Sequence, residues 1–152
     1  MIKTVTFEKT TYAPLPSRLE AGTPNIAGGV GLGVALEYLM SFDLERVARF
    51  EAGLVRQLEE GLRAIEGVRV LASPKERASA VSFGVEGAHP QDIGILLDNY
   101  GVAVRVGHHC AQPVLHKLGV EATVRASVGL YTTPEDIDQL LHALPKVIEM
   151  LC

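Results

Sequence analysis

The residues best suited to chemistry lie in one short stretch, RVGHHCAQP, which runs from Arg105 to Pro113. It follows the apolar run Val102–Val104, which is typical of a short buried strand. Gly107 lets the chain turn sharply, and Pro113 can occupy the first turn of a following helix. Cys110 is therefore predicted on a strand-to-helix connection, where rigid elements often present reactive groups. The neighbouring Arg105 and two histidines would favour the thiolate, which is the nucleophilic form.

Two other interpretations of this stretch remain open on the residues alone. Free cysteine is among the most buried residue types, so Cys110 can equally be a structural side chain beside two solvated histidines. The stretch and its surroundings also hold ligand types that zinc prefers: His108, His109, Cys110 and His116. Adjacent residues rarely point at one ion, however, and no Cys-x-x-Cys pair completes the set. Zinc is therefore the weaker of these alternatives.

The composition limits the classes of protein to which the chain can belong. Its 152 residues are enough for one domain, or one domain with an appendage, and for a real core. Because 47% of the residues are hydrophobic and only 5% are aromatic, that core must be aliphatic. The net charge of −4 argues against nucleic acid as a main partner. No membrane span is expected either, since no apolar run approaches roughly 18 residues.

Cysteine usage and the first residues indicate a compartment. Cys110 and Cys152 are the only cysteines, and Cys152 is the last residue, so they do not make a disulfide framework. Residues 1–4 lack the apolar core of a signal peptide. We therefore expect a reducing, cytoplasmic setting in which Cys110 is a free thiol.

The N-terminal part of the chain has the least regular pattern. Residues 1–7 alternate weakly and predict a short strand, whereas residues 8–25 show no periodicity. A structureless stretch of that length is unusual inside a compact domain, so we expect an arm that packs on something outside this chain. A helix is predicted over Ile26–Met40, capped by Thr23 or Asn25. Thr23 at a helix start could also bind phosphate, although plain capping is the commoner use of such residues.

The rest of the chain carries the patterns of further helices and strands. Apolar residues spaced by three or four predict helices at 44–66 and 134–151. A further helix is expected from Pro90 to Asp98 or Asn99, ended by Gly101, and a short one over 111–118. Pro145 lies inside the helix at 134–151 and should kink it. Short apolar or alternating runs predict strands at 68–71, 80–85, 102–104 and 123–128, with a turn at 73–77. This order indicates an α/β (α+β) two-layer sandwich: a small, mostly antiparallel sheet with helices on one face.

Arg125 is a charge in the middle of the last predicted strand, where apolar residues are usual on at least one face. It could be an edge-strand arginine paired with a carboxylate of the same chain. It could also anchor the carboxylate of a ligand, because the planar guanidinium suits bidentate binding of that group.

Five motifs, in order along the chain, carry a resemblance to a known family: RLEAGTPN at 18–25, LDNYG at 97–101, RVGHHCAQP at 105–113, VRAS at 124–127 and YTTPEDID at 131–138. With them the chain resembles the C-terminal part of a Suf-type (group II) cysteine desulfurase or selenocysteine lyase. These are class V aminotransferase-like enzymes of fold type I that use pyridoxal 5'-phosphate (PLP). The resemblance implies that residues 1–40 are the tail of the large PLP domain and a connecting helix. Residues 41–152 would be the small domain that carries the catalytic cysteine.

The resemblance also implies roles for matching residues. Cys110 would attack the sulfur of PLP-bound L-cysteine (or L-selenocysteine) and become a persulfide, with release of L-alanine. Arg125 would hold the substrate carboxylate. Thr23 would reach the PLP phosphate of the neighbouring subunit in a homodimer. Three residues would shape the cysteine loop: Arg105, His108 and His109. The sulfur would pass to an acceptor protein of the Suf system for iron–sulfur cluster assembly.

The chain departs from the family in one respect. Family members are much longer, and their large domain supplies the lysine that binds PLP, together with an aspartate and a stacked histidine. The five lysines of this chain, at positions 3, 9, 75, 117 and 146, lie in no matching motif. We therefore expect a fragment that neither binds PLP nor turns over L-cysteine on its own. The alternative is a stand-alone small domain that acts as a persulfide carrier or a protein-docking module without PLP.

Overall fold

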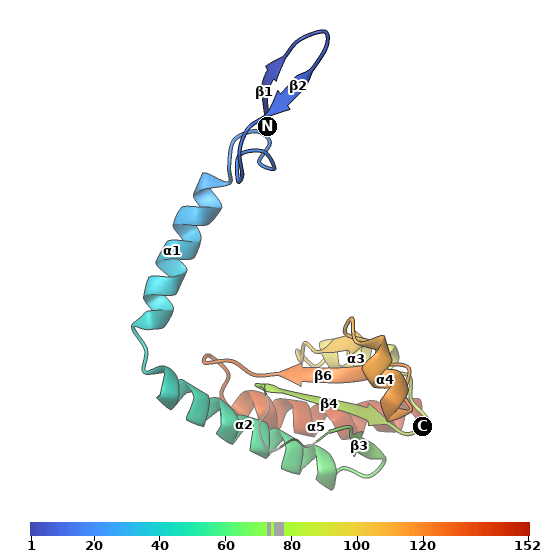
Figure 1. Ribbon diagram of the computed structural model, residues 1–152. Coiled ribbons are helices and arrows are strands. Elements are labelled where there is room, and N and C mark those ends of the chain that lie inside the picture. The colour runs from blue at the N-terminus through green and yellow to red at the C-terminus, as the bar shows by residue number, and fades with distance from the viewer. Residues whose placement is uncertain (73, 75–77) are drawn as a thin grey trace. The chain divides into compact units, whose positions relative to one another are not determined.

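A computed structural model describes residues 1–72, 74 and 78–152. These residues form two compact units, Met1–Leu44 and Glu45–Cys152 (Figure 1). The boundary predicted from the sequence falls after Met40, and the assignment of the first part to a larger PLP domain stays a prediction. The turn predicted at 73–77 lies outside the described residues, apart from Pro74.

The first unit begins with an antiparallel hairpin of β1 (Ile2–Val5) and β2 (Thr10–Tyr12), in which Ile2 pairs with Tyr12 and Val5 with Thr10. The Thr6 amide donates to the carbonyl of Lys9 at 2.9 Å and closes the turn. The expectation of a structureless arm from residue 8 is therefore wrong at β2. A strand this short has no room to display an alternating pattern, so its pairing could not be recognised from the residues.

Helix α1 (Ile26–Met40) follows, with the predicted bounds. The Asn25 side chain accepts a hydrogen bond from the Gly28 amide at 2.9 Å, so Asn25 rather than Thr23 caps the helix. None of the residues of α1 is buried within its own unit, although the helix is apolar on every side. A helix of that kind is normally covered by other protein.

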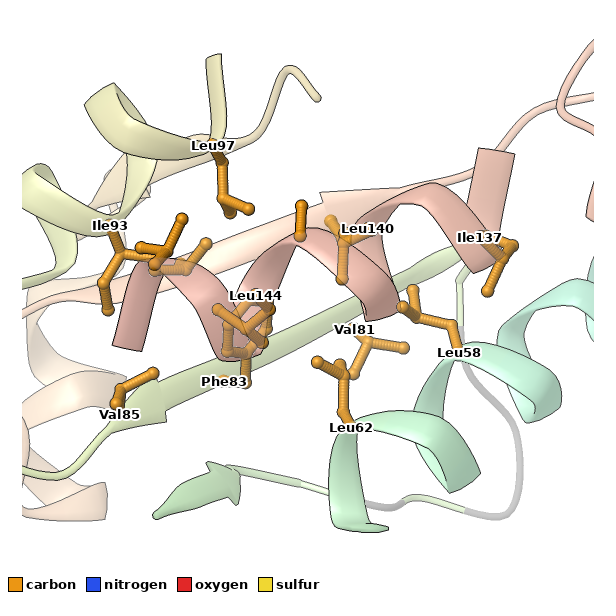
Figure 2. Close-up of a cluster of buried hydrophobic side chains, with 14 of the residues drawn as sticks. Leu58, Leu62, Val81, Phe83, Val85, Ile93, Leu97, Ile137, Leu140 and Leu144 are labelled. Atoms are coloured by element: carbon orange, nitrogen blue, oxygen red, sulfur yellow. The ribbon is translucent and has the colours of Figure 1, made fainter. Parts of the chain in front are cut away.

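The second unit is a four-stranded sheet in which every neighbouring pair is antiparallel. In spatial order the strands are β3 (Val68–Val70), β4 (Ala80–Val85), β6 (Thr123–Ser127) and β5 (Arg105–Gly107). The helices of this unit are α2 (Leu44–Ala64), α3 (Pro90–Asp98), α4 (Gln112–Leu118) and α5 (Pro134–Leu151). Helices α2, α3 and α5 pack on one face of the sheet, which confirms the predicted two-layer architecture (Figures 1 and 2).

The core lies between this helix layer and the sheet. Val81, Phe83 and Val85 alternate along β4 with less buried residues and point toward the helices. Figure 2 shows the helix side chains that meet them: Leu58, Leu62, Ile93, Leu97, Ile137, Leu140 and Leu144. Apart from Phe83 the buried cluster is aliphatic, as the composition predicted. The side of β4 and β6 away from the helices is the face that carries the polar residues described below.

The predicted strand at Val102–Val104 is wrong, and the strand β5 begins instead at Arg105. Gly101 has a φ of 73°, and the Val102 amide donates to the Leu97 carbonyl at 3.1 Å, so residue 102 is hydrogen-bonded to the last turn of α3 rather than to a strand. Val102 and Val104 are half-buried and pack against the core without belonging to a strand. Their apolar character reflects this packing, which needs no partner strand.

Helix α5 begins with the capping box that the sequence predicted. The Thr133 amide donates to Asp136 Oδ2 at 2.8 Å, and the Asp136 amide donates to Thr133 Oγ1 at 3.3 Å. Pro134 occupies the first turn, and Pro145 lies inside the helix. No single helix in the described part of the chain is long and apolar enough to cross a membrane; α1 and α2 pass that test only when counted together as a bent pair.

Candidate active site

The candidate site lies on the face of the sheet away from the helices. Val124 and Ala126 of β6 point into the core, so Thr123, Arg125 and Ser127 belong to the opposite face. Arg125 pairs with Ser82 of β4 on one side and with Arg105 of β5 on the other. Strand β6 is therefore an interior strand, and the interpretation of Arg125 as an edge-strand residue is wrong.

Arg125 is half-buried and has unused hydrogen-bonding capacity. Its Nε is buried and has no hydrogen-bond partner among the described residues. Arg105 lies directly opposite on β5, and like charges in that position destabilise a strand pair. The described residues place no carboxylate in an ion pair with either arginine. Two neighbouring guanidinium groups without a counter-charge are well suited to an anionic ligand, above all a carboxylate.

The loop after β5 has an unusual backbone. Gly107 has a φ of 114°, His109 a φ of 54° and Cys110 a φ of 58°. Glycine adopts such values freely, but for a residue with a side chain the left-handed region costs about 1–2 kcal/mol of conformational energy. The loop is closed locally, because the Ala111 amide donates to the His108 carbonyl at 2.8 Å and the Cys110 amide to His108 Nδ1 at 3.3 Å. Strained backbone of this kind clusters at functional sites.

Cys110 is exposed and is a free thiol. The interpretation of a buried structural cysteine is therefore wrong. The thiol lies on the loop between the end of β5 and the start of α4, which confirms the prediction that Cys110 lies on a connection between a strand and a helix. His108 is also exposed, and it contacts Cys110 through the backbone amide rather than through the sulfur.

His109 faces the sheet instead of the solvent. Its Nε2 lies 2.8 Å from Thr123 Oγ1, while its Nδ1 is buried without a hydrogen-bond partner in the described part of the chain. Burial lowers the pKa of His109 below 6.5, and the positive charges of Arg125 and Arg105 lower this pKa further. The imidazole is thus neutral at pH 7 and can both donate and accept a hydrogen bond.

The proposed zinc ligands do not come together. Among residues 1–72, 74 and 78–152, no group of three or more His, Cys, Asp or Glu side chains is placed to hold a metal ion. His109 is directed to Thr123, and His116 lies in the last turn of α4.

Thr23, the predicted phosphate ligand, belongs to the first unit, whereas Cys110 and Arg125 belong to the second. It is exposed, and its hydroxyl makes no hydrogen bond with a described residue. Asn25 caps α1, so Thr23 is not needed for capping. Its role toward a phosphate stays a prediction.

Sequence reasoning missed Thr123, which is fully buried and contacts the cysteine loop through His109. The signal that could have identified it is weak. Thr123 lies directly opposite Gly107 across the pair of β5 and β6, and only the register of the strands reveals this.

Comparison with known proteins identifies the family. Residues 1–140 match the model of the aminotransferase class-V family, and the chain belongs to this family. It is 46% identical over 147 residues to the cysteine desulfurase of Synechococcus elongatus, with 97% of this chain and 24% of that protein covered. It is also 46% identical over 151 residues to probable cysteine desulfurase 2 of Mycobacterium leprae, with 98% and 36% covered.

Solved structures give the same result. The chain superposes on the cysteine desulfurase CsdA of Escherichia coli with a TM-score of 0.87 and 38% identity, covering 100% of this chain and 38% of that one. For the cysteine desulfurase of Thermococcus onnurineus NA1 the TM-score is 0.83 at 38% identity, with 99% and 38% covered. The fold and the family are thus those that the five motifs predicted. The chain spans between about a quarter and two fifths of the length of these relatives.

Proposed function

We propose that this chain is part of a PLP-dependent cysteine desulfurase, in which Cys110 takes the sulfur of L-cysteine as a persulfide and L-alanine is released. The observation that carries the proposal is the pairing of two features in one unit. One is an exposed thiol on a strained turn, and the other is a half-buried arginine whose Nε has no partner among the described residues. The relatives named above are cysteine desulfurases, which supports the same activity.

Arg125 would bind the carboxylate of the amino-acid substrate. Its interior position on β6 fixes the backbone on both sides, so the guanidinium is held by a rigid element rather than by a loop. The neighbouring Arg105 adds positive charge on the same face of the sheet. A carboxylate there would pair with the guanidinium of Arg125 and relieve the repulsion between the two arginines.

Cys110 would accept the sulfur atom. Its thiolate attacks the sulfur of the bound substrate, so that a sulfur–sulfur bond forms while the carbon–sulfur bond of the substrate breaks. The electron pair of the broken bond stays with the substrate carbon and needs an electron sink. PLP supplies such a sink when an enzyme holds it. The exposed position of Cys110 would then leave the persulfide open to an acceptor protein.

The residues of this chain do not by themselves fit PLP. A PLP enzyme joins the cofactor to a lysine within an enclosed site. The described lysines, Lys3, Lys9, Lys117 and Lys146, are all exposed, and Lys146 lies over the Tyr100 ring at 5.8 Å. We therefore assign to this chain the carboxylate and sulfur sites only, and to the remaining length of the protein the cofactor lysine.

The proposed partners are a second subunit and a sulfur-acceptor protein. We propose a homodimer in which Thr23 reaches the PLP phosphate of the neighbouring subunit. We also propose a Suf-type acceptor protein that takes the persulfide sulfur toward iron–sulfur clusters in the cytoplasm. A second candidate function, a stand-alone persulfide carrier, is favoured by one observation: the second unit has its own aliphatic core and an exposed thiol.

A chimera tests the proposal. The segment of E. coli CsdA that this chain matches is replaced by this chain, and alanine formation from L-cysteine is measured. The parent chimera should be active, C110S should lose sulfur transfer, and the matched control C152S should keep it. R125K keeps the positive charge but cannot bind a carboxylate with two parallel hydrogen bonds. Because a hydrogen bond to a charged group contributes roughly 1.5–3 kcal/mol, the KM for L-cysteine should rise about 10- to 150-fold. A C110S chimera that still transfers sulfur at the parent rate would contradict the proposal. Sulfur uptake by the isolated chain from a free persulfide would favour the carrier function.

A further inference from the structure

Thr123 stands apart from the rest of the core. It is 0% exposed, and within the described residues it is the one polar side chain that is fully buried. It is the first residue of β6 and lies directly opposite Gly107, the last residue of β5. Its hydroxyl therefore lies where the cysteine loop leaves the sheet.

The hydroxyl of Thr123 contacts the loop through one residue. That residue is His109, whose Nε2 lies 2.8 Å from Thr123 Oγ1. The other hydrogen bonds at the turn, from the amides of Cys110 and Ala111 to His108, stay inside the loop. Among the described residues, the contact of His109 with Thr123 is thus the side-chain hydrogen bond that joins residues 108–111 to the sheet.

The turn needs such support because it is strained. His109 and Cys110 are consecutive residues with side chains, and both have a φ in the left-handed region. Conformations of this kind persist only where the surroundings hold them. The amides of Cys110 and Ala111 hold the turn to His108, and the thiol of Cys110 is exposed. The side chain that can restrain the turn against the sheet is that of the neighbouring His109.

We propose that Thr123 is a positioning residue that, through His109, holds the strained turn in which Cys110 is presented. The catalytic meaning of this role rests on the proposed function, whereas the restraint of the turn does not. The hydroxyl is the group that matters, because in either tautomer of His109 it completes the bond to Nε2. Valine has nearly the shape of threonine and suits a strand, but it leaves the imidazole without that partner.

The first experiment measures the turn directly in the whole 152-residue chain. Amide hydrogen exchange is followed by NMR for the parent chain, T123V and T123S, with the Ala111 amide as reporter and the Leu71 amide, which donates to Ser82, as reference. In T123V the Ala111 amide should exchange roughly three- to tenfold faster, the change expected when one hydrogen bond is lost. T123S should restore the parent rate, and the Leu71 amide should not change.

Two results of this experiment would overturn the proposal. One is an Ala111 exchange rate that is the same in T123V and in the parent chain. The other is an equal acceleration of the Ala111 and Leu71 amides, because Thr123 would then stabilise the whole unit and not the turn.

The second experiment measures sulfur transfer in the chimera with CsdA. T123V should lower kcat for persulfide formation on Cys110 and leave KM for L-cysteine unchanged, while T123S should rescue kcat. An unchanged kcat in T123V would overturn the catalytic part of the proposal. If the exchange results hold but Cys110 carries no sulfur in any chimera, the proposed function fails and the restraint by Thr123 stands.

Discussion

Gly94 of α3 offers a quantitative test of how the helix layer supports the strand that leads into the cysteine loop. A Cβ at this position would lie 2.7 Å from Cγ1 of Val106, on β5, which is far shorter than a normal carbon–carbon contact. Neither partner can yield easily. Val106 is β-branched and stiff about χ1, and its backbone is paired with Val124 of the interior strand β6.

The magnitude follows from two opposing effects in G94A. Replacing a glycine by alanine inside a helix ordinarily stabilises it by about 1 kcal/mol. Inserting a methyl group into a packed contact costs about 1–3 kcal/mol. Gly53 of α2 is the matched control, because a Cβ there meets no atom within 4 Å and only the favourable effect remains. G94A should therefore be about 1–3 kcal/mol less stable than G53A.

The assay is urea unfolding of the parent chain and both variants, followed by circular dichroism and fitted for the free energy of unfolding. Because Gly53 and Gly94 both lie in the second unit, the same transition reports on both. Equal stabilisation by G94A and G53A would refute the close packing of α3 on β5. It would also mean that α3 does not rigidly support the strand that leads into the cysteine loop.

Four further predictions can be tested on the 152-residue chain itself. Because the pKa of His109 is lowered on folding, the unfolded chain binds more protons, so the free energy of unfolding should fall as the pH drops below about 6.5; H109Q should flatten this dependence. A limiting alkylating reagent should label Cys110 before Cys152, because the Cys152 Sγ donates to the Glu86 carbonyl at 3.5 Å. Mass spectrometry reads each site, and faster labelling of Cys152 at every pH would contradict this prediction. PLP followed by borohydride should not label one specific lysine of this chain, and a single stable adduct would show the opposite. Sedimentation should show self-association, since α1 is apolar on all sides; a clean monomer at high concentration would argue against it.

The long elements could be predicted from the sequence because their patterns are local. The helices α1 and α5 have the predicted bounds, and the capping box at Thr133 was readable from residue types and spacing alone. The errors fall on short elements. Strand β2 is only three residues long, and Val102–Val104 is an apolar connection whose burial resembles that of a strand. A short apolar run does not distinguish these cases.

The reactive residues of the candidate site could be predicted from the sequence, but the contacts that hold the cysteine loop could not. A thiol beside cations and an arginine inside a strand are unusual residue types at their positions, so Cys110 and Arg125 could be identified without a structure. The contact of His109 with Thr123 depends on the register that places Thr123 opposite Gly107. It also depends on the left-handed turn that directs the imidazole back to the sheet. The register is a tertiary feature, and the residue types of His109 and Cys110 do not predict left-handed backbone at two consecutive positions.

The mass of one tryptic peptide shows whether Cys110 receives the sulfur of L-cysteine. Trypsin releases Cys110 within Val106–Lys117 and Cys152 within Val147–Cys152, so the two thiols are read separately. The chimera with CsdA is incubated with L-cysteine and digested without reductant. If Cys110 is the sulfur acceptor, Val106–Lys117 becomes heavier by one sulfur atom, and a thiol reductant removes the added mass. Alanine formation with no added sulfur on that peptide, or with the sulfur on Val147–Cys152, would contradict the role proposed for Cys110.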